Sequence, residues 1–174
     1  MTMSEHLKLD SVSDMLAFGL AVVTEASERY AEMAEAMDAH NNTKVAEIFR
    51  EMADIEELHA EGVQRQISQL NLDVPKTDYQ WTSPEGPETG DFSDLHYLMT
   101  PREALLLALH NEKRAATYFA DVAEKVTNDE VKKMAQEMAK EEQEHVQWVE
   151  KWLLDYPDDE NEWVEDNDPP VEQG

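Results

Sequence analysis

Apolar residues recur at spacings of three and four along four long stretches of this 174-residue chain. A helix turns once in about 3.6 residues, so this spacing places the apolar side chains on one helical face. The four predicted helices span roughly residues 12–39, 43–70, 100–126 and 128–154. The pattern predicts an all-α protein with two helices on each side of a long irregular stretch.

Residues that favour helix starts precede three of these stretches. Ser11 or Ser13 can cap the first helix, because a serine side-chain oxygen accepts a hydrogen bond from a free backbone N–H. Thr100 is followed by Pro101, a residue favoured at the first helical position. Asn128 can cap the fourth helix in the same way. These signals predict the helix starts independently of the apolar pattern.

The stretch from 71 to 99 has no sustained period and contains three prolines and two glycines. Irregular connections of this length are uncommon in compact domains, but a four-helix bundle with parallel second and third helices needs one crossover. We therefore expect a single bundle domain over residues 1–154, with the crossover at about 71–99. Residues 155–174 are mostly acidic, and we expect them to form a flexible tail.

The second and fourth predicted helices carry the same short motif, a glutamate followed three residues later by a histidine. The copies are Glu56-x-x-His59 and Glu142-x-x-His145, which lie 86 residues apart. Residues three positions apart share one helix face, so each pair can point into the interior. We interpret the chain as a duplicated helical hairpin. The same separation relates the apolar neighbours Val45 and Val131, Ile48 and Met134, Met52 and Met138, Ala53 and Ala139, and Val63 and Val149.

Glu112 is a further candidate ligand, because it interrupts an otherwise apolar face of the third helix. A buried charge is costly unless a cation or a partner compensates it. Carboxylates together with imidazoles suit iron, manganese or zinc. We therefore predict an interior metal site made by Glu56, His59, Glu112, Glu142 and His145; the alternative is a pair of core histidines satisfied by hydrogen bonds. The predicted face of the third helix consists of Leu105, Leu106, Leu109, Glu112, Ala115, Ala116, Phe119, Val122, Ala123 and Val126.

The first helix offers no obvious counterpart to Glu112. If Tyr30 is matched with Phe119, the equivalent position is Val23. Glu25 lies two residues further on, about 200° around the helix, on a face that we expect to meet solvent. We predict that Glu25 is not a ligand, although a local bulge could turn it inward.

Several other polar side chains are interpreted as surface groups. The histidines at 40, 96 and 110 lie off the apolar faces or in loops, where a solvated imidazole is the usual case. Glu141 and Glu144 flank the second motif and are expected to point outward.

Composition narrows the function further. A net charge of −26 argues against nucleic-acid binding, which needs a basic surface. The acidic surface either keeps the protein soluble or concentrates cations near the metal site. With no Cys, disulfides and thiolate metal sites are excluded. No apolar run reaches the roughly 18 residues of a membrane span, and Met1–Asp10 lack an apolar segment, so we expect a cytoplasmic protein.

Three segments resemble rubrerythrin-type ferritin-like proteins: residues 50–59, residues 100–119 and residues 138–145, the last reading Met-Ala-Lys-Glu-Glu-Gln-Glu-His. The resemblance extends over about residues 12–154. It implies a dimeric, ferritin-like, non-haem di-iron four-helix bundle that reduces hydrogen peroxide or reacts with dioxygen, with no catalytic residue beyond the metal ligands. Matched position by position, it implies a terminal ligand at Glu112, bridging ligands at Glu56 and Glu142, and one imidazole on each metal from His59 and His145.

Three departures from that family bear on the expected activity. Rubrerythrins usually carry a rubredoxin-like domain with four Cys, and the lack of Cys here implies an external electron donor. Val23 would leave one metal short of a carboxylate, and Ala115 stands where the family often has a further Glu. Three functions stay open: a peroxide-reducing oxidoreductase, a metal-binding or iron-buffering protein without turnover, and a helical interaction module.

Overall fold

The computed structural model describes residues 11–72 and 96–158 of the chain. Most of the predicted crossover (71–99) and acidic tail (155–174) lie outside the described residues. The described residues form four α-helices: α1 (Val12–Ala39), α2 (Thr43–Gln69), α3 (Pro101–Lys125) and α4 (Asp129–Leu153). Their bounds agree with the predicted ones to within one or two residues.

The predicted helix caps are formed. Ser11, the first of the two candidate serines, accepts a hydrogen bond from the backbone N–H of Asp14 at 3.1 Å. Thr100 and Glu103 form a reciprocal capping box at the start of α3. Asn128 accepts from two backbone N–H groups in the first turn of α4. These caps satisfy N–H groups that the helices themselves leave free.

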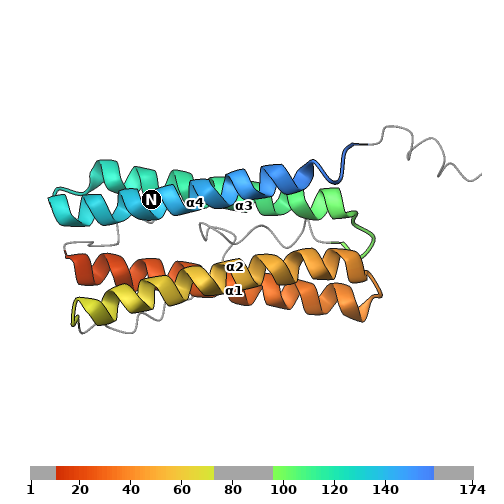
Figure 1. The fold of residues 1–174 in the computed structure, drawn as a ribbon, viewed down its shortest axis with the longest axis horizontal. Coiled ribbons are helices and arrows are strands. Elements are labelled where there is room, and N and C mark those ends of the chain that lie inside the picture. Colours follow the sequence, from red (N-terminus) through yellow and green to blue (C-terminus); the bar gives the residue numbers. More distant parts are fainter. Residues whose placement is uncertain (1–10, 73–95, 159–174) are drawn as a thin grey trace, which may run out of the picture.

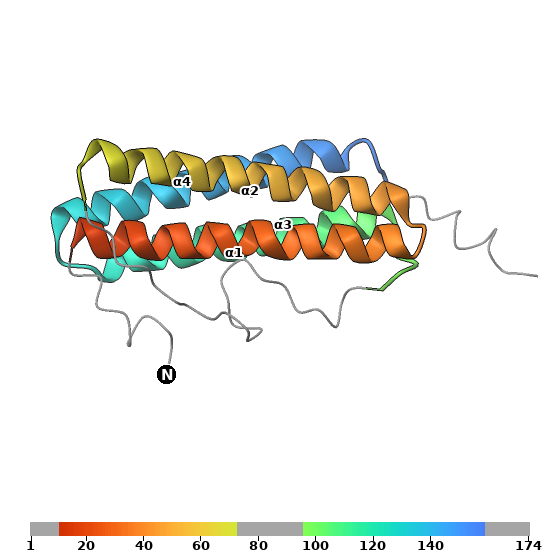
Figure 2. The same ribbon diagram turned by 90° about the horizontal axis from the view of Figure 1, so that it is seen from below.

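The helices form two antiparallel hairpins, α1 with α2 and α3 with α4, that lie side by side (Figure 1). Helix α2 ends at the opposite end of the bundle from the start of α3, so α2 and α3 run in the same direction (Figures 1 and 2). This is the ferritin-like four-helix bundle that the sequence predicts. No helix in the two described ranges is long and apolar enough to cross a membrane.

A polar contact ties the first hairpin to the start of the second. The turn between α1 and α2 contains Asn41 in the left-handed region, with φ of 62°, a conformation that asparagine tolerates. The next residue, Asn42, donates from Nδ2 to the carbonyl oxygens of Tyr97 and Met99, at 3.1 and 2.9 Å. These bonds hold the turn against the segment that enters α3.

The apolar core falls into two clusters, which we name after Phe49 and Phe119. The Phe49 cluster contains Tyr30, Met33, Ala34, Met37, Val45, Ala46, Ile48, Phe49, Met52, Ala53, Met99, Ala104, Leu105, Ala108 and Val149. The Phe119 cluster contains Met15, Leu16, Phe18, Val22, Val23, Val63, Phe119, Val122, Ala123, Val131, Ala135 and Met138.

One residue of the predicted core is misplaced. Leu106 was assigned to the apolar face of the third helix, but it is 43% exposed, and this prediction is wrong. Its neighbour Leu105 is fully buried. Successive residues are about 100° apart around a helix, so the two side chains cannot both face the same core.

Candidate metal centre

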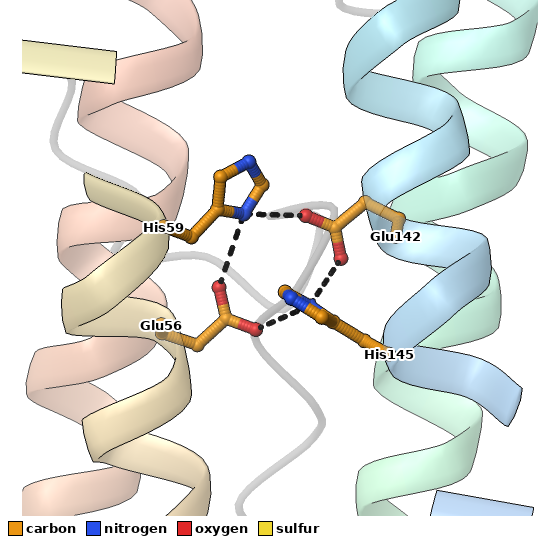
Figure 3. Close-up of side chains that lie close together, drawn as sticks. All are labelled: Glu56, His59, Glu142 and His145. Carbon is orange, nitrogen blue, oxygen red and sulfur yellow. Dashed lines mark ion pairs between the residues drawn. The ribbon is translucent and has the colours of Figure 1, made fainter. Parts of the chain in front are cut away.

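Among the described residues, five titratable side chains lie in the interior between the Phe49 and Phe119 clusters. Glu56, Glu112 and Glu142 are fully buried, and His59 is nearly so. The fifth, His145, has a side chain that is 17% exposed. Helices α2 and α4 each supply one glutamate and one histidine, and the two pairs face each other across the bundle (Figure 3). The structure thus brings together all five predicted residues; that they bind metal stays a prediction.

Each of the two motif glutamates presents one oxygen to each imidazole (Figure 3). Nδ1 of His59 lies 3.2 Å from Oε1 of Glu142 and 3.9 Å from Oε2 of Glu56. Nδ1 of His145 lies 3.4 Å from Oε1 of Glu56 and 3.5 Å from Oε2 of Glu142. The carboxylates therefore separate the interior into two positions, which we call the His59 subsite and the His145 subsite.

Glu112 belongs to the His145 subsite. Its Oε2 lies 3.4 Å from Nδ1 of His145, and its Oε1 accepts a hydrogen bond from the hydroxyl of Tyr30 at 3.3 Å. The Tyr30 hydroxyl thus donates to a candidate metal ligand. Glu56, His59, Glu142 and His145 each offer one ligand atom, and these four atoms all lie within 4.8 Å of one another; Glu112 is not in that group.

Helix α1 contributes no carboxylate to this interior in the described structure. Val23, the counterpart of Glu112, is fully buried and belongs to the Phe119 cluster. Oε1 of Glu25 lies 3.5 Å from Nη2 of Arg29, one turn along the same helix. With a side chain only 14% exposed, Glu25 is less open to solvent than its sequence position predicts. Helix α1 is continuous from Val12 to Ala39, with no bulge to turn Glu25 inward.

The expectation that Glu141 points outward is wrong in part. Its side chain is 53% exposed, yet its Oε2 is in ion-pair contact with Nε2 of His59 on α2. A carboxylate on the outer ring nitrogen orients a metal-binding imidazole and leaves the other nitrogen free for the metal. Here that other nitrogen is Nδ1, which faces Glu56 and Glu142. The periodicity of α4 could not reveal this contact, because it depends on a residue of another helix.

Two of the buried carboxyl groups, those of Glu112 and Glu142, have strongly perturbed pKa values. Burial, and then the charge of Glu56, raise the pKa of Glu112 well above its usual range. Burial also acts to raise the pKa of Glu142, but its contacts with His145 and His59 outweigh burial and lower that pKa. Glu142 is therefore the carboxylate that the imidazoles hold in its ionised form.

The two imidazoles retain their protons beside these carboxylates. Burial alone would lower the pKa of His59, but Glu141 and Glu142 outweigh it and raise that pKa to about 9. The pKa of His145 is also raised, because Glu112 and the neighbouring carboxylates outweigh its burial. In the metal-free protein, protonated imidazoles therefore supply positive charge at the places where cations would bind.

Unpartnered buried atoms test whether a metal fits these residues. Within the described ranges, both oxygens of Glu56, both of Glu142, Oε2 of Glu112 and Nδ1 of both imidazoles are buried without a hydrogen-bond partner. Buried polar atoms are rarely left unpartnered, and each such group calls for an explanation. Hard carboxylate oxygens and imidazole nitrogens suit iron, manganese or zinc. The residues fit a metal centre.

Outside the centre, the histidines at 40, 96 and 110 are exposed, as predicted. His40 stacks on Tyr97, and Nε2 of His96 lies 3.2 Å from Oε2 of Glu103. Sequence reasoning missed Asn111, which precedes Glu112, is almost fully buried and has no hydrogen-bond partner for either amide atom in the described structure. A single polar residue beside a predicted apolar face gives no signal strong enough to identify it.

Comparison with known proteins supports the same assignment. The model of a family described as rubrerythrin matches residues 14–87 and 103–172. The crystal structure of an uncharacterised conserved protein from Magnetospirillum magnetotacticum MS-1 is similar to this chain, with 38% sequence identity and a TM-score of 0.62. The alignment covers 86% of this chain and 97% of that one. No curated protein matches the chain.

Proposed function

The chain belongs to the rubrerythrin family, and we propose that it holds two irons and reduces hydrogen peroxide, or reacts with dioxygen, at them. One observation carries this proposal. Glu56 and Glu142 each direct one oxygen to the His59 subsite and the other to the His145 subsite. A carboxylate placed in this way is suited to bridge two metal ions, as in the di-iron carboxylate proteins built on the same kind of bundle.

The proposed ligands divide between the subsites. Glu56 and Glu142 would serve both ions, His59 one ion, and His145 with Glu112 the other. Two bound ferrous ions would supply the two electrons that, with two protons, convert one hydrogen peroxide into two waters. Manganese is compatible with the same ligands, whereas zinc would support binding without redox chemistry.

The chain's own residues prepare the site in three ways. Full burial of Glu56, Glu112 and Glu142 excludes water and strengthens their attraction to a cation. The hydroxyl of Tyr30 holds the carboxylate of Glu112 by a hydrogen bond. His145, whose side chain is 17% exposed, is the most exposed of the five candidate ligands.

We further propose that electrons come from a separate donor, since the sequence has no cysteine that could form a rubredoxin-like relay. The resemblance to rubrerythrins supports a homodimer, which light scattering in solution would test. The cytoplasmic location stays a prediction from the sequence.

Metal binding without turnover is a second candidate, favoured by Val23. Where α3 supplies Glu112, α1 supplies an apolar side chain, so one ion would have fewer protein ligands. Such a centre could hold or buffer iron without reducing peroxide at a useful rate.

Anaerobic loading with Fe²⁺ followed by rapid mixing with peroxide separates these functions. We expect the bound iron to be oxidised faster than free Fe²⁺, and expect the exposed-site control Glu144→Gln to behave like the wild type. Binding without faster oxidation would favour the second candidate. If no Fe²⁺ binds, both candidates fail, and the interaction module becomes the better explanation.

A further inference from the structure

We propose that the two metal positions are unequal, with the first ion held tightly in the His145 subsite and the second held weakly in the His59 subsite. The weaker position would keep a coordination site open to a small anion from solvent. This inference rests on the proposed metal centre and states how that centre fills. It follows from how this chain distributes its own donors, supporting groups and charges.

The donors are unequally divided. Four donor atoms meet in the His145 subsite: Nδ1 of His145 and one oxygen each from Glu56, Glu142 and Glu112, at 3.4, 3.5 and 3.4 Å from that nitrogen. In the described part of the chain, three meet in the His59 subsite: Nδ1 of His59 with the other oxygens of Glu56 and Glu142, at 3.9 and 3.2 Å. A metal with fewer protein donors binds more weakly and completes its coordination with exogenous ligands.

The missing donor can be traced to the internal duplication. Matching Tyr30 with Phe119 pairs Val23 with Glu112, and both members of the second pair are fully buried. Because valine has no donor atom, it presents only an apolar wall. Glu25, two residues further on, forms an ion pair with Arg29 on the same helix, with 3.5 Å between its Oε1 and Nη2 of Arg29. The group of potential ligand atoms found among the described residues includes none from α1.

The supporting groups differ in the same direction. Tyr30 donates its hydroxyl to Glu112, the carboxylate of the His145 subsite. Its counterpart Phe119 has no hydroxyl and packs in the same apolar cluster as Val23. Glu112 and its hydrogen-bond donor Tyr30 thus correspond to the apolar pair Val23 and Phe119. Because both members of the pair differ in the same way, we infer that the His59 subsite has no further carboxylate by sequence, and not because a side chain has moved away.

Charge makes the second ion harder to bind. Three buried glutamates, Glu56, Glu112 and Glu142, contribute three negative charges when ionised. With neutral imidazoles, one divalent ion leaves one negative charge, and a second leaves one positive charge. An uncompensated buried charge is strongly unfavourable. Glu141, in contact with His59, opposes that charge only partly because it is half exposed to water. A small anion at the open position would complete the balance.

Anaerobic titration with Co²⁺, followed by calorimetry and visible absorption, tests the order of filling. We expect two steps in the wild type, the second at least ~10-fold weaker, since even a lost outer-shell partner costs a metal site about that much. His59→Ala should remove the second step and leave the first nearly unchanged. His145→Ala should weaken the first step by ~10-fold or more. Azide should tighten the second step and not the first.

Val23→Glu provides the converse test, because it restores the missing carboxylate. We expect the second step to approach the first in affinity, while the matched control Glu25→Gln on the same helix changes neither. The new carboxylate is buried and could prevent folding without metal. The two histidine variants keep the inference testable in that case, because neither adds a buried charge.

The outcomes separate this inference from the proposed function. Two equal steps, or equal losses in His59→Ala and His145→Ala, would overturn the inference and leave a di-metal centre standing. A single step that His145→Ala abolishes and His59→Ala spares would support it in its strongest form. If neither Co²⁺ nor Fe²⁺ binds, the proposed metal centre itself is wrong and the inference falls with it.

Discussion

The two hairpins of this protein follow one plan but contribute unequally to its centre. Helices α2 and α4 each present a glutamate and a histidine, and each glutamate reaches both imidazoles. Helices α1 and α3 differ, because α3 buries Glu112 where α1 buries Val23. The duplication is preserved in the two Glu-x-x-His motifs and has diverged where α3 has Glu112 and α1 has Val23. A glutamate that serves both positions cannot be lost without harming both, whereas a ligand of one position can.

The divergence also changes what each side contributes to stability. Burying Val23 beside Phe119 removes apolar surface from water and favours folding. Burying Glu112 opposes folding in the metal-free protein, because its pKa is raised above the ordinary value mainly by burial. Glu112 on α3 therefore lowers the stability of the metal-free protein and would raise metal affinity. Val23 on α1 raises that stability and adds no ligand.

The largest expected effect tests the shared part of the plan. Glu56→Gln and Glu142→Gln each remove a ligand from both subsites, so each should weaken binding of the first Co²⁺ by about 100-fold or more. Titration under identical conditions measures both losses, with Glu144→Gln as the exposed control. If one variant lost far more affinity than the other, the two hairpins would not be equivalent even in their common motif.

The second prediction compares the two imidazoles through pH. A histidine whose pKa is raised on folding stabilises the folded state fully below its unfolded pKa of about 6.5. For His59, that stabilisation is lost as pH rises through about 9. We expect the metal-free protein to lose a few kcal/mol of unfolding free energy between pH 6.5 and 9, measured by urea denaturation with a chelator present. His59→Ala should reduce this slope but leave the part due to His145, whose pKa is also raised.

His145 should keep its proton to higher pH than His59, because three carboxylates contact its Nδ1 and raise its pKa. Nuclear magnetic resonance of the two imidazoles would show His59 titrating first. The reverse order would contradict the asymmetry, because it would mean that the carboxylates stabilise the proton on His59 more strongly than the proton on His145.

The third prediction concerns the residue by which the hairpins differ. Glu112→Gln should weaken the first metal step by ~10-fold or more and bring it close to the second. The same change should make the metal-free protein more stable at pH 8, because ionising a carboxyl with a raised pKa favours the unfolded state. Glu25→Gln, at the nearest acid on α1, is the matched control. If Glu112→Gln made the metal-free protein less stable than the wild type, the Glu112 carboxyl would be favourably paired in the folded state even without metal.

These comparisons also show what the sequence could and could not predict. The helices were predictable because their apolar period and the caps at Ser11, Thr100 and Asn128 are local signals. The five gathered residues were predictable because two signals agreed: a repeated motif, and one charge on an apolar face. The contact from Glu141 to His59 was not, because it joins exposed and buried groups on different helices. How the two subsites divide the carboxylate oxygens likewise depends on side-chain geometry that no spacing encodes.

The smallest expected effect concerns Tyr30, which differs from its counterpart Phe119 by one hydroxyl. Tyr30→Phe makes the two positions identical and removes the hydrogen bond to Glu112, which at 3.3 Å is long. A net loss of about 1 kcal/mol, or roughly fivefold in the first metal step, is the expected size. The second step should not change, because this hydroxyl donates to the carboxylate of the His145 subsite. Co²⁺ titration measures both steps at once; an equal loss in both would mean that Tyr30 supports the whole bundle rather than one side of the centre.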